Sequence, residues 1–82
     1  MPNERTEAVE THHALIRELK GRSAIVAEAV ENAHDSRLED GILYLKYLDH
    51  LNNIFARVLT DSEHKPVLDQ AATEIGIQVV LE

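Results

Sequence analysis

The chain has 82 residues, enough for one domain with a small hydrophobic core. It contains no cysteine, which excludes disulfides and thiolate metal sites. Its 15 acidic and 8 basic residues give a net charge of −7, which disfavours binding to nucleic-acid phosphates and favours a basic protein as a charged partner.

The ends of the chain and its hydropathy bear on domain organisation and location. Residues 1–5 are polar, lack the pattern of a signal peptide and are expected to be disordered. No apolar run approaches the roughly 18 residues that a membrane span needs. We expect one domain over residues 1–82, cytoplasmic and without a membrane partner. Leu81 and Glu82 have the look of a cloning scar and are set aside from the functional argument.

Two helices are predicted in the first part of the chain. Apolar residues recur at helical spacing from about Thr6 to Lys20. Gly21 suits a helix C-cap, and Ser23 suits the N-cap of a second helix over residues 24–33. The apolar stripe stays in phase across Gly21, so one long helix is the alternative. We favour a break or kink at Gly21.

The middle segment predicts the helix at the centre of the fold. Residues 36–39 (Ser-Arg-Leu-Glu) match a capping box, which indicates a helix from there to about Thr60. Its apolar residues span an arc of roughly 160°, and packing against one neighbour needs only a little over 100°. This helix should therefore contact at least two others. Either its whole apolar stripe is internal core, or one flank meets another chain, and the width of the arc favours the second interpretation. The predicted interaction surface comprises Tyr44, Tyr47, Leu48, Leu51 and Phe55.

A last helix is predicted from about Glu63, with Pro66 in its first turn. Residues 77–80 would suit a strand as well as a helix end, and they are interpreted as helix because no partner strand is evident. In that case Ile77 and Val80 lie off the main stripe and need a partner. The fold class is thus an all-α bundle of three or four helices, whose small core is expected to be completed by homodimerisation.

Histidines supply the alternative interpretation, a metal-binding helical bundle with a di-iron-like or zinc site. Glu10 and His13, and again Glu31 and His34, match the Glu-x-x-His spacing that places two ligands on one helix face. His12 lies within its apolar stripe. It is interpreted as a histidine at the edge of the core, satisfied by a carboxylate or carbonyl, with a pH-sensing role as the alternative.

Motifs for enzymatic chemistry are absent from the sequence. No serine lies in a nucleophile elbow, and no phosphate-binding glycine motif occurs. Paired carboxylates are frequent, but a bundle of this size can hardly enclose a substrate pocket. The leading interpretation is a non-enzymatic, acidic protein-interaction or regulatory module without a cofactor.

Residues 23–32 (SAIVAEAVEN), a turn, and residues 38–51 (LEDGILYLKYLDHL) resemble the central part of the YmgB/AriR family. That family comprises small regulators of biofilm formation and acid resistance. The resemblance implies a helical, dimeric and non-enzymatic protein. It transfers no functional residue to this chain.

Overall fold

The computed structural model describes residues 4–49 and 52–82 and shows a mixed α/β fold. The prediction of an all-α bundle is therefore wrong. The helices are α1 (Glu4–Lys20), α2 (Ala24–Glu31), α3 (Ile54–Thr60) and α4 (Lys65–Glu74). The strands are β1 (Asp35–Glu39), β2 (Ile42–Lys46) and β3 (Gln78–Leu81), in the sheet order β1-β2-β3.

The break between α1 and α2 is confirmed. α1 ends at Lys20, and Ser23 caps α2 by accepting a hydrogen bond from the amide of Val26 through its hydroxyl oxygen, at 3.4 Å. The amide of Ser23 donates to the carbonyl of Leu19 at 2.7 Å and closes the turn at Gly21. Local capping thus outweighs the apolar stripe that continues in phase across this turn.

The predicted central helix is replaced at its start by a β-hairpin. Asp40 and Gly41 join β1 to β2 with φ values of 52° and 77°, so both central residues of the turn lie in the left-handed region, as a type I′ turn requires. The Asp-Gly pair is a strong hairpin signal between two apolar runs, and it explains why Gly41 is there. The capping-box interpretation of residues 36–39 is therefore wrong, since these residues form β1.

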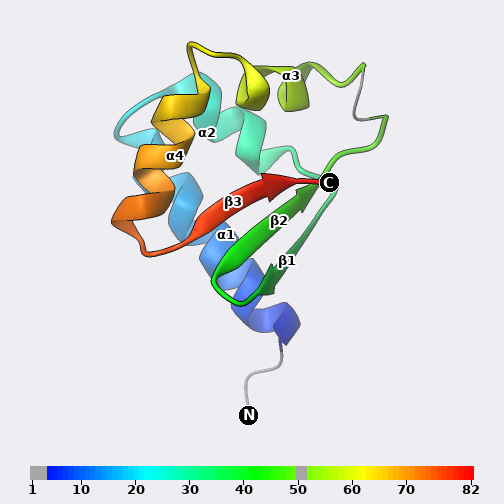
Figure 1. Cartoon of the computed structure of the whole chain (residues 1–82), viewed down its shortest axis with the longest axis vertical. Helices are drawn as coiled ribbons and strands as arrows, with labels where there is room; N and C mark the ends of the chain where they lie inside the picture. Colours follow the sequence, from blue (N-terminus) through cyan, green and yellow to red (C-terminus); the bar gives the residue numbers. More distant parts are fainter. Residues whose placement is uncertain (1–3, 50–51) are drawn as a thin grey trace.

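Burial along β2 alternates as expected for a strand with one face on the core. Leu43 and Leu45 are fully buried, whereas Ile42 and Tyr44 are half-buried on the opposite face. The wide apolar arc of the middle segment is thus two elements, β2 and α3, that reach one core from different directions. Figure 1 shows the sheet in front of α1, with α4 alongside β3 and with α2 and α3 towards the top of the view.

β3 pairs with β2 in parallel, and α3 and α4 supply the crossover that such a pair needs. The end of α4 is a Schellman motif. The amide of Ile77 donates to Ala72 at 2.9 Å, and the amide of Gly76, with a φ of 80°, donates to Thr73 at 3.0 Å. Gly76 thus ends the helix, and the helical interpretation of residues 77–80 is wrong because β2 is the missing partner strand.

The two C-terminal residues belong to the fold. Leu81 ends β3, and the amide of Glu82 donates to the carbonyl of Leu45 at 2.9 Å. The Glu82 carboxylate also accepts a hydrogen bond from Arg37 at 2.7 Å. Setting these residues aside as a scar therefore overlooks a part of the sheet.

Candidate functional site

The predicted interaction surface does not form one surface in the structure. Tyr44 lies on the open face of β2, while Tyr47 is buried and Phe55 is half-buried on α3. Leu48 is 60% exposed in the loop after β2. Leu51 lies outside the described residues. The helical periodicity that united these residues does not exist, because β2 and a loop occupy this part of the chain.

Tyr47 is a core residue. Its hydroxyl donates a hydrogen bond to the carbonyl oxygen of Ala29 on α2. Burial raises the pKa of the Tyr47 phenol well above its ordinary value of about 10. The side chain therefore ties the segment that follows β2 to α2 and is not available to a partner.

The predicted metal ligands are not gathered into one site. Glu10 and His13 are exposed on α1, Glu31 ends α2, and His34 is exposed just before β1. Within residues 4–49 and 52–82, one group of three potential ligands comes close enough to share an ion, and it consists of other residues, Asp61, Glu63 and His64.

The Asp61 cluster has a structural explanation. The Asp61 carboxylate bonds the His64 ring at 2.8 Å and accepts from the amide of Glu63 at 3.4 Å, in the turn that leads into α4. The hydrogen bond to His64, followed by that from the Glu63 backbone, lowers the pKa of Asp61. These are the contacts of a side chain that orders a turn, as aspartates commonly do.

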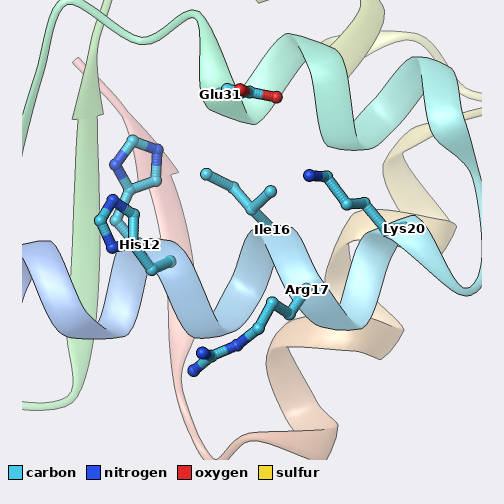
Figure 2. A pocket seen from close by; sticks show the side chains of 6 residues that line it. His12, Ile16, Arg17, Lys20 and Glu31 are labelled. Atoms are coloured by element: carbon cyan, nitrogen blue, oxygen red, sulfur yellow. The ribbon is translucent and has the colours of Figure 1, made fainter.

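A groove of about 350 Å³ lies along α1 beside the end of α2. It is lined by His12, His13, Ile16, Arg17, Lys20 and Glu31. Figure 2 shows Glu31 on α2 across from Ile16, while Arg17 points away from α2. Arg17 and Lys20 lie in the last turn of α1, where the helix dipole favours positive charge. The cationic side chains do not converge on one point, so the groove offers no evident site for an anion.

His12 in this groove makes the contact predicted for a histidine at the edge of the core. Its Nε2 lies 2.7 Å from the carbonyl oxygen of Val30. A carbonyl can only accept, so Nε2 carries a hydrogen and donates it. This hydrogen bond gives Nε2 of His12 its partner and joins α1 to α2.

The face of the sheet turned away from the helices carries a stack of Arg37 on Tyr44, with the guanidinium carbon 4.3 Å from the ring centre. Arg37 also pairs with Glu39, and with Glu82 at 2.7 Å. The hydrogen bond to Glu82 is the main cause that raises the pKa of Arg37. This network joins β1 to the end of β3 across β2.

The free edge of β3 is the chemically distinctive feature of the molecule. The amides of Gln78 and Glu82 donate to Gly41 and Leu45 of the β2 side at 3.0 and 2.9 Å. Successive residues of a strand point their amides in alternate directions, so the N–H and C=O groups of Val79 and Leu81 point away from β2. Of the strands in the described part of the chain, none lies on that side.

A groove of about 370 Å³ runs along this edge, between β3 and α4. Its lining residues are Lys65, Asp69, Ala72, Thr73, Ile77, Gln78, Val79 and Val80. Three of its four aliphatic side chains come from the segment that ends α4 and begins β3. Lys65 and Asp69 form an ion pair at 3.2 Å, so the charged part of the rim is locally neutral.

The two outer strands of the sheet differ in how they are protected against pairing with another chain. β1 carries Asp35, Arg37 and Glu39, and charges on an edge strand oppose pairing with another chain. β3 has no charged residue from Gln78 to Leu81. Val80 is 42% exposed, and Val79 and Leu81 are only half-buried although they lie on the helix side of the sheet. β3 is therefore an edge strand without charges of its own, beside a groove with both polar and aliphatic side chains.

Part of this site was predicted from the sequence. Ile77 and Val80 were marked as residues in need of a partner, and both line the groove. The free edge was missed, because the strand itself was interpreted as helix. The available signal was Gly76 followed by four residues rich in β-branched side chains, which is typical of a helix C-cap and a short strand.

No family model matches the chain, and no curated protein or solved structure compared with it is similar to it. The segment that resembles the YmgB/AriR family contains α2 and part of the β-hairpin, so the helical fold implied for residues 38–51 is not observed over residues 38–49. In the part of the chain that the structure describes, every helix is too short or too polar to cross a membrane.

Proposed function

We propose that this chain is a non-enzymatic protein-interaction module that binds its partner by strand addition at the free edge of β3. In this mode an extended segment hydrogen-bonds to the unpaired main-chain groups of an edge strand, and side-chain pockets beside the strand give specificity. The regulatory role that the YmgB/AriR resemblance implies would be exercised through this edge.

Two features of β3 together carry the proposal. Its amides at Val79 and Leu81 point away from β2, and it has no charged residue. Val79 and Leu81 present two N–H donors and two C=O acceptors on the side of β3 away from β2, and Val79 also lines the groove beside α4. Natural edge strands are normally blunted by charge, proline or a cover. β1 has such charges and β3 has none, so the difference within one sheet supports a binding role for β3.

The remaining parts of the proposal rest on the sequence. The lack of a nucleophile elbow or phosphate-binding motif supports a non-enzymatic role, and the lack of cysteine suits the cytoplasm. The net charge of −7 favours a partner segment that is basic.

The test uses a defined probe, an extended hexapeptide of alternating valine and lysine, added to the ¹⁵N-labelled chain. We expect saturable amide shift changes that are largest at Val79 and Leu81, whose amides point away from β2, and at Thr73, which lines the groove. The control is the same peptide with one valine and the adjacent lysine replaced by proline. Neighbouring residues point their N–H groups in opposite directions, so one of the two prolines removes an N–H that would face β3. Uniform small changes with both peptides would contradict strand addition.

Leu81→Pro provides the matched test on the protein side. Proline removes one outward N–H, and it is tolerated in an edge strand where that group does not bond the neighbouring strand. We expect the variant to lose the peptide-induced shifts while the amides of β2 keep their positions. Undiminished peptide binding by a folded Leu81→Pro variant would show that the β3 edge is not the docking site.

A further inference from the structure

We infer that the strand which adds to β3 is β3 of a second copy of this chain, antiparallel, with the two Val80 residues facing each other across a two-fold axis. This inference rests on the proposed function and names the partner of the same edge. It turns the three-stranded sheet into a continuous six-stranded sheet with the helices of both copies on one side.

The hydrogen-bonding groups of β3 are self-complementary in this register. Val79 and Leu81 point their N–H and C=O groups outward, and they are equally spaced on either side of Val80. An antiparallel pair centred on Val80 places Val79 opposite Leu81 of the partner subunit, and Leu81 opposite the partner's Val79. Each of these two pairs exchanges two hydrogen bonds. The two outward N–H groups and the two outward C=O groups of each copy are therefore all used.

The same register covers apolar side chains that the single copy leaves partly open. Val79 and Leu81 lie on the helix side of the sheet and are only half-buried, and no strand of the described residues pairs with the outer edge of β3. The second strand brings its own valine and leucine against them. On the open face, Val80 neighbours Tyr44 in the β2 register, so the two copies place two such Tyr-Val pairs in one row.

Local charge is compatible with a second copy, although the whole chain is acidic. Gln78 is neutral, Lys65 and Asp69 neutralise each other, and the Glu82 carboxylate is paired with Arg37. Like charges therefore do not meet directly at the shared edge. The residual repulsion between two copies acts over long distances and is screened by salt.

Salt separates a second copy from a basic peptide as the occupant of the edge. Screening weakens the attraction between an acidic protein and a basic segment, but it reduces the repulsion between two acidic copies. We expect self-association to become stronger as salt is raised, as measured by light scattering over a dilution series. Dissociation into monomers with added salt would contradict the inference.

Single cysteines test the register, because the chain has no cysteine of its own. In the proposed pair the two Val80 residues form a non-hydrogen-bonded antiparallel pair with a Cα separation of about 4.5 Å, within the range of a disulfide. We expect Val80→Cys to become a disulfide-linked dimer in a glutathione redox buffer.

Gln78→Cys is the matched control on the same strand and the same face. In this register the two copies of residue 78 lie about 13 Å apart, too far for a disulfide. We expect this variant to stay uncrosslinked. Equal crosslinking of both variants would overturn the register, and so would crosslinking of Gln78→Cys alone.

The outcomes separate this inference from the proposed function. If the chain is monomeric and Val80→Cys does not crosslink while the valine-lysine peptide shifts Val79 and Leu81, the second copy is wrong and strand addition stands. If neither the peptide nor a second copy occupies the edge, both proposals fail. Circular dichroism of each variant confirms that it is folded before either result is read.

Discussion

Tyr47 donates its hydroxyl hydrogen to the carbonyl oxygen of Ala29 inside the core. In Tyr47→Phe this carbonyl loses its donor, and a buried polar group left unsatisfied costs about 1–3 kcal/mol of unfolding free energy. We expect a loss of that size in urea denaturation, with an unchanged circular dichroism spectrum. Tyr44→Phe is the control, since Tyr44 lies on the open face of β2. Equal stability of the two variants would show that the Tyr47 hydroxyl contributes nothing.

At the scale of the element, the β-hairpin depends on its turn. Gly41 has a φ of 77° with nothing within 4 Å of an added Cβ, so Gly41→Ala meets conformational strain and no clash. We expect it to lower the unfolding free energy by about 1–2 kcal/mol. At Gly21 no left-handed φ is needed, and an added Cβ would lie 3.7 Å from the Glu18 carbonyl oxygen.

Gly21→Ala is therefore the matched control for the turn. We expect it to be neutral or stabilising by up to about 1 kcal/mol, because alanine restricts the unfolded chain more than glycine does. Thermal or urea denaturation compares both variants with the parent. If Gly21→Ala proved the more damaging, the assignment of the special conformation to Gly41 would be wrong.

For the whole molecule, the net charge of −7 is the dominant electrostatic property. The ion pairs Arg22–Glu18 and Lys65–Asp69 are on the surface and contribute little. Repulsion among the excess carboxylates should therefore decide the response to salt. We expect the melting temperature to rise from low to moderate salt. The measurement uses dilute protein, so that association does not contribute, and a fall in melting temperature would contradict this expectation.

The sequence by itself determined the features that depend on neighbouring residues. The break after Lys20, the Ser23 cap and the place of Pro66 in the first turn of α4 were predicted correctly, because each follows from contacts within a few positions. His12 was also interpreted correctly, since a polar ring within an apolar stripe needs a partner close by.

Only the tertiary structure decided the sheet, and with it the candidate site. Residues 77–80 had no visible partner because β2, with which they pair, lies far away along the chain and was itself interpreted as helix. A strand is stable only when its main-chain groups are paired. Because β2 was interpreted as helix, residues 77–80 had no strand to pair with and were interpreted as helix too. The free edge of β3 exists because β2 occupies just one of its two sides, which no local pattern of residues can express.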